Sequence, residues 1–306
     1  MTTVLITGPT RGLGRAATLD MAARPAAERP ELILVGRAGP GLTEVAAEAR
    51  ALGATVHEVG CDLARLADVR AAAATVQQLL GEDGKLSALV ANAGAMTTDT
   101  RTASADGYEL TFAVNYLAHA QLIADLNDRF APSARIILIG SNTYHANFWR
   151  RLLHVPPAKW ADPVEMSRPA TGDANPGMES SGTAYSNAKL AVLYYAHELQ
   201  RQIGAGVNVV VYEPGWMPGT ALGRGAPEAA QAAGRALARI PGIATPENSG
   251  PTLASLALDP RWAGLRDGAF VVRGKLTEVK PIAHNRDRER RLWEATGELL
   301  EKAGSR

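Results

Sequence analysis

At 306 residues the chain is long enough for one large domain or two, and its 46% hydrophobic and 21% charged residues are ordinary for a soluble globular protein. The formal net charge of +1 gives no electrostatic reason to expect a nucleic-acid partner. The single cysteine, Cys61, excludes an internal disulfide and a cysteine-based metal cluster.

The first residues lead directly into an apolar run, TVLIT at 3–7, without the charged and apolar regions of a secretory signal. Neither this run nor any other apolar run in the sequence approaches the ~18 residues that a membrane-spanning helix needs. We therefore expect a soluble, cytoplasmic protein with no transmembrane segment.

Short apolar runs alternate with helical patterns along most of the chain. The runs predict strands, and the longer periodic stretches between them predict helices. The strands are continuously apolar, which indicates burial on both faces of a sheet. The pattern predicts an α/β fold, a doubly wound parallel sheet of about seven strands with helices on both faces. The predicted strands are 3–7, 31–37, 55–63, 86–94, 134–141, 207–215 and 268–272, and the predicted helices are 13–24, 42–53, 66–81, 106–128 and 183–202.

Residues 142–182 interrupt this alternation, with no clear strand and many proline, tryptophan and arginine residues. The segment leaves and re-enters the carboxyl edge of the predicted sheet, where open α/β folds bind ligands. We therefore interpret 1–306 as one domain in which 142–182 is an insertion that forms a substrate lid. The alternative is an insertion that packs on the scaffold. The aromatic residues of the insertion favour an apolar or polycyclic substrate, and they are Tyr144, Phe148, Trp149 and Trp160.

A glycine-rich turn, TGPTRGLG at 7–14, follows the first predicted strand and opens the first predicted helix. Glycines allow the backbone to approach a pyrophosphate closely, and a helix N-terminus attracts its negative charge. The turn therefore predicts a dinucleotide site. The alternative is a plain strand-to-helix turn.

The second predicted strand ends with Gly36 and Arg37, where NAD-binding folds carry an acidic residue that grips the ribose. A guanidinium suits a 2′-phosphate by its charge and its forked donors. Arg11, inside the glycine turn, supplies a second positive charge. The two arginines favour NADP over NAD, and the alternative is that both are solvated surface residues.

Seven motifs, in order along the chain, resemble the short-chain dehydrogenase/reductase family. The resemblance covers nearly the whole chain, and it implies a Rossmann-type fold and a nicotinamide-dependent oxidoreductase such as a ketoreductase. Three longer stretches, at 104–123, 185–202 and 290–300, resemble the retinol dehydrogenase and protochlorophyllide reductase-like branch. The seven motifs are the glycine turn, CDL at 61–63, NAG at 92–94, VNYLAHA at 114–120, LIGSN at 138–142, YSNAK at 185–189 and PGWMPGT at 214–220.

Tyr185 and Lys189 lie one helical turn apart on one face of a predicted helix. A free tyrosine has a pKa near 10, and a neighbouring ammonium favours its phenolate form. The resemblance implies that Tyr185 exchanges a proton with the substrate oxygen, that Ser141 holds the same oxygen, and that Lys189 also holds the nicotinamide ribose. It further implies that Asn115 positions a water beside Lys189. The predicted catalytic residues are Asn115, Ser141, Tyr185 and Lys189.

The resemblance also implies a set of NADP-binding residues, at the glycine turn and at the ends of successive strands. PGWMPGT has one residue more than the related pattern between Pro-Gly and Thr, so the contact of Thr220 with the carboxamide stays open. Predicted substrate residues are Tyr144, Trp149, Trp216 and Met217. The predicted cofactor-binding residues are Gly8, Thr10, Arg11, Gly12, Leu13, Gly14, Arg37, Asp62, Leu63, Asn92, Ala93, Gly94, Tyr185, Lys189, Pro214, Gly215 and Thr220.

Other functions remain compatible with the sequence. The related branch also reduces carbon–carbon double bonds, which is an alternative to carbonyl reduction. A non-catalytic NADP-binding regulator would be expected to lose the tyrosine or the lysine, and both are present. HANFWRRLLHV, at 145–155, is amphipathic enough to permit a protein partner or a peripheral membrane contact.

The assembly state and the metal content can also be considered from the sequence. Related enzymes often dimerise through the helices that carry Asn115 and Tyr185. Whether the insertion blocks that face stays open, and so does the choice between homodimer and monomer. The six histidines show no metal-ligand spacing, and we expect no metal site. His197 is expected to be a packing or surface residue.

Overall fold

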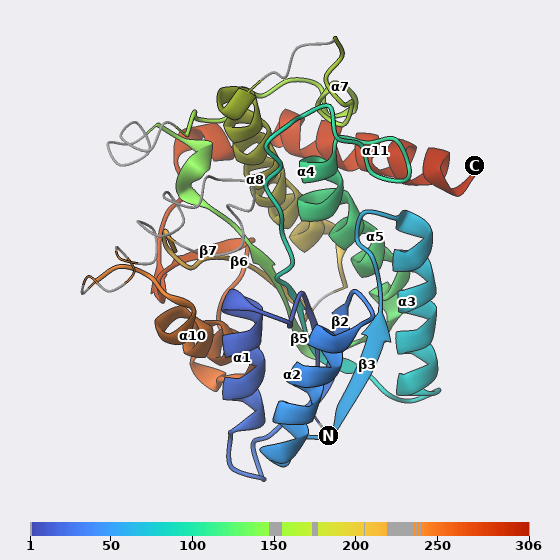
Figure 1. The fold of residues 1–306 in the computed structure, drawn as a ribbon, viewed down its shortest axis with the longest axis vertical. Helices are drawn as coiled ribbons and strands as arrows, with labels where there is room; N and C mark the ends of the chain where they lie inside the picture. The colour runs from blue at the N-terminus through green and yellow to red at the C-terminus, as the bar shows by residue number, and fades with distance from the viewer. Residues whose placement is uncertain are drawn as a thin grey trace.

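A single sheet forms the centre of the molecule (Figure 1). The structure, a computed structural model, describes residues 2–146, 155–172, 177–204, 206–218, 236, 238, 240 and 242–305. The strand order is β3-β2-β1-β4-β5-β6-β7-β8, in which the first seven strands are parallel and β8 is antiparallel to β7. The strands are β1 (Thr3–Thr7), β2 (Glu31–Gly36), β3 (Val56–Gly60), β4 (Leu86–Ala91), β5 (Phe130–Ile139), β6 (Asn208–Glu213), β7 (Ala269–Val272) and β8 (Lys275–Leu276).

The predicted doubly wound α/β fold is confirmed. The sheet also has an eighth strand, which is only two residues long and therefore too short to be predicted from a sequence pattern. The order reverses between β1 and β4, because the chain fills one half of the sheet before it crosses to the other. In folds of this kind the crevice at the carboxyl ends of the strands on either side of the reversal binds the ligand.

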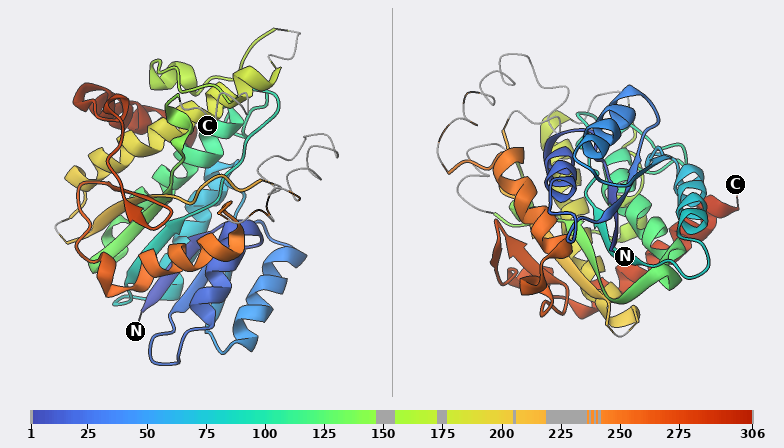
Figure 2. Two further views of the ribbon diagram at one scale, coloured as in Figure 1. Left: turned by 90° about the vertical axis from the view of Figure 1, so that its left-hand side faces the viewer. Right: turned by 90° about the horizontal axis from the view of Figure 1, so that it is seen from below.

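Side chains of each central strand enter two separate cores on the two faces of the sheet, as the continuously apolar strands predicted. Leu5 and Ile33 point into one core, and their neighbours Val4 and Leu32 point into the other. Figure 2 (left) shows the three resulting layers, with α10 in orange on one side of the sheet and α8 and α11 in yellow and dark red on the other. One layer contains α1 (Gly12–Ala22), α2 (Pro40–Ala51) and α10 (Pro246–Leu258), and the other contains α3 (Leu66–Leu80), α5 (Ala118–Asp125), α8 (Gly177–Gln202) and α11 (Arg286–Gly304).

The predicted helix over 106–128 is divided in the structure. It begins as α4 (Leu110–Phe112), widens to a π-helical turn, η1 (Ala113–Leu117), and continues as α5. The Glu109 carboxylate caps its start by accepting from the backbone N–H groups of Thr111 and Phe112. A π turn inserts one extra residue into a helix and is frequent at functional sites. Here the turn carries Asn115.

The C-terminal helix α11 packs along α8 and reaches α3 (Figures 1 and 2). The Trp293 ring stacks on Tyr195, with 5.6 Å between ring centroids and 19° between ring planes. Tyr195 in turn meets Tyr116 edge to face. The Tyr108 hydroxyl donates to the Leu299 carbonyl oxygen at 2.7 Å. The helices that carry Asn115 and Tyr185 are therefore covered by a helix of the same chain.

Candidate active site

The glycine turn at 8–14 lies at the carboxyl end of β1, next to the reversal in strand order. Gly8 and Gly12 have φ angles of +65° and +54°, a region that favours glycine. A Cβ on Gly14 would lie 2.2 Å from the Gly8 carbonyl oxygen and 2.4 Å from the Asn92 Nδ2 atom. The turn therefore needs glycine at these positions, two for backbone conformation and one for close packing.

The end of β4 is bonded to the glycine turn. Asn92 Nδ2 donates to the carbonyl oxygens of Thr7 and Gly8, at 2.9 and 3.1 Å. The Ala93 N–H donates to Thr7 Oγ1 at 3.0 Å. A Cβ on Gly94 would lie 2.7 Å from Asn115 Oδ1. These contacts place the predicted cofactor residues that follow β1 and β4 side by side, at the reversal in strand order.

The two arginines predicted to select NADP are exposed at the carboxyl ends of neighbouring strands, β1 and β2. Among the contacts that the structure gives for the described residues, neither guanidinium has a hydrogen bond or an ion pair. Asp62 follows β3, and its Oδ1 accepts from the Ala64 N–H at 3.0 Å. Arg11, Arg37 and Asp62 thus follow three adjacent strands at one edge of the sheet.

Tyr185 and Lys189 are both buried on α8, with 8% and 3% of their surface exposed. Lys189 Nζ lies 5.6 Å from the centroid of the Tyr185 ring and donates to the Ile139 carbonyl oxygen at 2.7 Å. Ile139 is the last residue of β5, two residues before Ser141. Ser141 is also buried, and its Oγ accepts from the Thr143 N–H at 3.3 Å. The long helix thus brings the tyrosine–lysine pair to the end of the strand that leads to the predicted serine.

Asn115 is held on both ends of its side chain. Its Nδ2 donates to the carbonyl oxygens of Ala95 and Thr111, at 2.6 and 2.7 Å, and its Oδ1 accepts from the Ala95 N–H at 3.2 Å. The side chain therefore fixes the loop after β4.

The segment after β6 contains five of the predicted residues, four of which lie in the described part of the chain. Pro214 accepts from Ser249 Oγ through its carbonyl oxygen at 3.1 Å, and Gly215 has a φ of +98°. Trp216 is exposed, and Met217 is partly buried against the core that includes α1 and α10. Thr220 and Trp149 lie outside the described residues.

Two aromatic residues of the insertion are not placed for a substrate wall. Tyr144 is 1% exposed, packs edge to face on Phe270, and accepts from the Lys280 N–H, so the substrate role predicted for it is wrong in this arrangement. Trp160 packs edge to face on Tyr194, with 4.6 Å between ring centroids. Tyr194 lies nine residues after Tyr185, which places the two side chains on opposite faces of the helix. Trp160 therefore packs on the face of α8 that points away from Tyr185.

The middle part of the insertion, 155–172, is fastened to the scaffold. Ser186 Oγ donates to the Pro156 carbonyl oxygen at 2.7 Å, and Arg291 of α11 pairs with Asp162 at 2.8 Å. Asp162 also caps the short helix α7 (Pro163–Met166). For these residues the scaffold alternative fits better than a lid over the crevice, while 147–154 and 173–176 lie outside the described residues.

A cavity of about 370 Å³ lies beside this segment, on the face of α8 away from Tyr185. Glu109, Lys159, Glu165 and Arg168 give it a mixed charge, and Asn187 belongs to its wall. This cavity is separate from the tyrosine–lysine pair and from the glycine turn.

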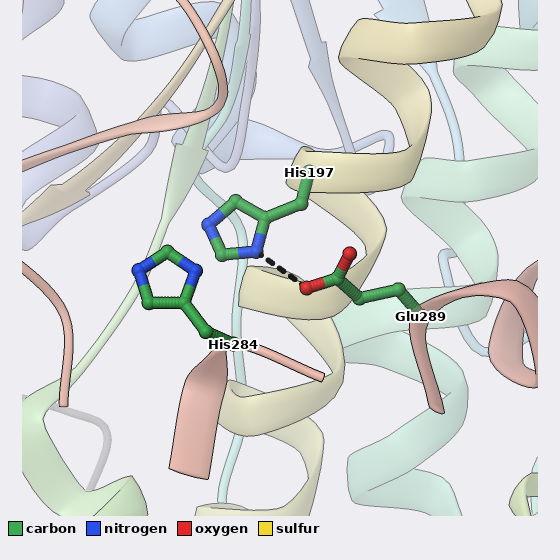
Figure 3. A group of neighbouring side chains, drawn as sticks. All are labelled: His197, His284 and Glu289. Atoms are coloured by element: carbon green, nitrogen blue, oxygen red, sulfur yellow. Dashed lines mark hydrogen bonds and ion pairs between the residues drawn. The ribbon is translucent and has the colours of Figure 1, made fainter. Parts of the chain in front are cut away.

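The structure brings together three possible metal ligands that the spacing of histidines did not reveal. Donor atoms of His197, His284 and Glu289 lie within 4.8 Å of one another, and His197 Nδ1 is hydrogen-bonded to Glu289 Oε1 at 3.1 Å (Figure 3). The two imidazole rings are stacked, with only 8° between their planes. Nitrogen lone pairs lie in the ring plane, so stacked rings do not direct them to one point. The contacts describe a buried hydrogen bond between α8 and α11, which agrees with the packing role expected for His197.

One buried residue beside the site was not singled out in the sequence. His119 lies within the NYLAHA motif, four residues after Asn115, and its imidazole contacts both Thr7 and Asn115. The spacing of four from Asn115 is the sequence signal that would have pointed to it.

The chain has relatives among known proteins. Residues 2–150 match the family model of the short chain dehydrogenases. The chain is 31% identical to a provisionally assigned daunorubicin C-13 ketoreductase from Streptomyces sp., over 96% of this chain and 91% of that protein. It is also 31% identical to retinol dehydrogenase 14 from Mus musculus, over 95% of this chain and 84% of that protein.

The fold has a similar neighbour among solved structures. A short chain dehydrogenase from Burkholderia cenocepacia, in complex with NADP, superposes with a TM-score of 0.63 at 20% identity, over 89% of this chain and 96% of that chain. The chain belongs to the short-chain dehydrogenase/reductase family. It is an oxidoreductase of that family, which uses a nicotinamide cofactor. No helix within the described ranges is both long and apolar enough to cross a membrane.

Proposed function

We propose that the chain is an NADPH-dependent ketoreductase, which transfers a hydride between nicotinamide and the carbonyl or alcohol of an apolar small molecule. The observation that carries the proposal is the buried pair of Tyr185 and Lys189, held at the carboxyl end of β5 by the bond from Lys189 to the Ile139 carbonyl. A buried ammonium next to a phenol has little other use than to adjust its acidity or to bind a polar ligand.

When bound, the nicotinamide supplies or accepts the hydride. Tyr185 then gives its phenolic proton to the substrate oxygen in reduction, or takes the proton from it in oxidation. The Lys189 ammonium stabilises the phenolate that remains, because the two groups lie in a buried region where charge interactions are strong. Ser141 is assigned to holding the substrate oxygen with its hydroxyl. Asn115 fixes the loop after β4 through its three side-chain hydrogen bonds.

The substrate class is supported by the relatives and by the exposed apolar surface near the site. The names of two relatives concern daunorubicin and retinol, each of which contains a carbon-ring system that an apolar wall can contact. Trp216 is among the few large hydrophobic side chains exposed in the described residues, and it follows β6 at the carboxyl edge. A panel of ketones and aldehydes, including polycyclic ones, incubated with NADPH and followed at the nicotinamide absorbance, tests the function. Absence of turnover with every member of the panel would contradict it.

We expect NADPH to bind more tightly than NADH. Arg11 and Arg37 carry exposed guanidinium groups on adjacent strand ends, where a 2′-phosphate would be bound. Loss of one charge-assisted contact costs about 1.5–3 kcal/mol, so Arg37→Ala should weaken NADPH binding by about 10–100-fold and leave NADH binding unchanged. Isothermal titration calorimetry measures both.

A matched control for that measurement is Arg50→Ala. Arg50 is also an exposed arginine, but it lies beside the first residue of β3, at the opposite edge of the sheet, and its guanidinium already pairs with Glu58 at 2.9 Å. Equal affinities of the unaltered protein for NADPH and NADH would contradict the assignment of the two arginines.

The rate of carbonyl reduction should fall as the pH rises through about 8. Burial lowers the pKa of Lys189 from 10.5 to about 8, so the amine is an ammonium below that pH and neutral above it. Reduction needs the protonated phenol and the adjacent ammonium, and both are lost at high pH. The pH dependence of kcat/KM checks this, and a profile that stays flat from neutral pH to pH 10 would exclude Lys189 as the group that assists Tyr185.

We also propose that the chain is a monomer. The helices through which related enzymes often dimerise are covered by α11, whose Trp293 and Thr296 contact Tyr195 and Tyr116. A second copy would have to displace these aromatic contacts. Sedimentation equilibrium should give the mass of one chain, and a mass of two chains independent of concentration would contradict the proposal.

A further inference from the structure

His119 connects three parts of the site that are distant in sequence. It lies on α5, directly after the π-helical turn that carries Asn115, and it is 4% exposed. Its Nε2 lies 3.0 Å from Thr7 Oγ1 at the end of β1, and its Nδ1 lies 3.4 Å from the Asn115 carbonyl oxygen. Thr7 Oγ1 also receives the N–H of Ala93, after β4.

The hydrogen-bond partners determine which ring nitrogen carries the proton. A carbonyl oxygen only accepts, so the Nδ1 that faces the Asn115 carbonyl must be the N–H donor. Nε2 is then an acceptor, and the Thr7 hydroxyl donates to it. The other acceptor within reach of that hydroxyl, the Val90 carbonyl oxygen, is farther away at 3.5 Å. The result is one directed chain, from the Ala93 N–H through Thr7 and His119 to the Asn115 carbonyl.

This chain requires a neutral imidazole. Burial lowers the pKa of His119 to about 4, and the positive charge of nearby Lys189 also lowers it. A protonated ring would have no lone pair for the Thr7 hydroxyl and would repel the Lys189 ammonium. The neutral ring instead adds no charge beside the ammonium that assists Tyr185.

We propose that His119 is a positioning residue, which ties the π-helical turn of Asn115 to the ends of β1 and β4 and so fixes the cofactor-binding backbone relative to Lys189. The inference rests on the proposed function for its link to turnover. Its link to cofactor binding rests on the assignment of the glycine turn to the cofactor, because Thr7 and Ala93 are the chain neighbours of Gly8 and Asn92, and the Asn92 side-chain amide donates to the turn.

The test uses variants that remove or retain parts of the chain of bonds. His119→Phe keeps a flat ring and removes both bonds. His119→Gln keeps an amide oxygen near the position of Nε2, so it can still accept from Thr7. Thr7→Val removes the hydroxyl with little change in shape. His197→Phe is the matched control, because it removes another buried and hydrogen-bonded imidazole, three turns along α8 from Tyr185.

We expect His119→Phe to lower kcat/KM for carbonyl reduction by about 10²-fold, since small displacements of catalytic groups have effects of this size. Part of the loss should appear as weaker NADPH binding by fluorescence titration. His119→Gln should recover part of kcat/KM and part of the NADPH affinity. His197→Phe should change neither quantity when each is expressed per mole of folded protein. The double variant His119→Phe/Thr7→Val should be no worse than the more damaging single one, because the two residues act in one chain.

The inference is overturned if His119→Phe leaves kcat and NADPH affinity unchanged, or if the effects of the two single variants multiply in the double variant. If His119→Phe does not fold, as judged by circular dichroism, His119→Gln and Thr7→Val decide the question in the same way. NADPH titration needs no turnover, so a protein that reduced no carbonyl compound would contradict the proposed function while the binding result still tested His119.

Discussion

Replacing Tyr185 with phenylalanine should lower kcat by about 10²–10⁴-fold and leave NADPH affinity unchanged. Phenylalanine keeps the aromatic ring of this α8 residue and removes only the hydroxyl that exchanges the proton. Lys189→Met should lower kcat and also weaken NADPH binding, because the ammonium is assigned to the nicotinamide ribose as well as to Tyr185. Steady-state kinetics with the best carbonyl substrate, together with NADPH titration, separates the two effects.

Tyr194→Phe provides the matched control on the same helix. Tyr194 lies on the far face of α8, and its hydroxyl donates to the Ile282 carbonyl oxygen. This variant should lose stability by about 1 kcal/mol, the worth of one hydrogen bond, and keep its kcat. Near-normal turnover in Tyr185→Phe would show that another group transfers the proton.

Gly14→Ala should abolish cofactor binding and lower the free energy of unfolding by about 3 kcal/mol. The added Cβ would lie 2.2 Å from the Gly8 carbonyl oxygen, and backbone cannot move aside as the end of a flexible side chain can. Overpacking of a close contact typically costs about 1–3 kcal/mol, and a contact this short belongs at the upper end. Urea unfolding followed by circular dichroism measures the loss, and calorimetry with NADPH measures binding.

Gly297→Ala is the control for the same chemical change. Gly297 lies exposed in α11, and a Cβ there would meet nothing within 4 Å. Since alanine favours a helix over glycine by about 1 kcal/mol, this variant should be slightly more stable and should bind NADPH normally. A Gly14→Ala protein as stable as the unaltered one would mean that α1 can move away from β1 at little cost.

The parts of the fold that the sequence predicted are those set by local patterns. The seven parallel strands follow from short apolar runs, and the glycine turn follows from the spacing of three glycines. Tyr185 and Lys189 could be paired from sequence because a helix brings residues four apart to one face. Each of these inferences uses residues that are close in the chain.

The parts that could not be predicted depend on contacts between distant residues. Tyr144 and Trp160 are aromatic residues in an irregular segment, and their composition suits a ligand wall as well as a core. Only the positions of Phe270 and Tyr194 decide that both are packing residues. The π-helical turn is another case, because nothing in the residues 113–117 distinguishes it from an ordinary helix.

The contacts of α11 also set an order of events during synthesis. Residues of this helix bind groups that the ribosome makes much earlier, through the bond from Arg70 to the Leu300 carbonyl and the bond from Tyr108 to the Leu299 carbonyl. Until residues 286–304 emerge, the aromatic surface around Tyr116 and Tyr195 stays uncovered on the nascent chain. The N-terminal half, which carries the glycine turn, can form before that point, but the half that carries Tyr185 is completed only by one of the last segments to be made. A nascent chain arrested before α11 would therefore display an apolar surface that chaperones bind.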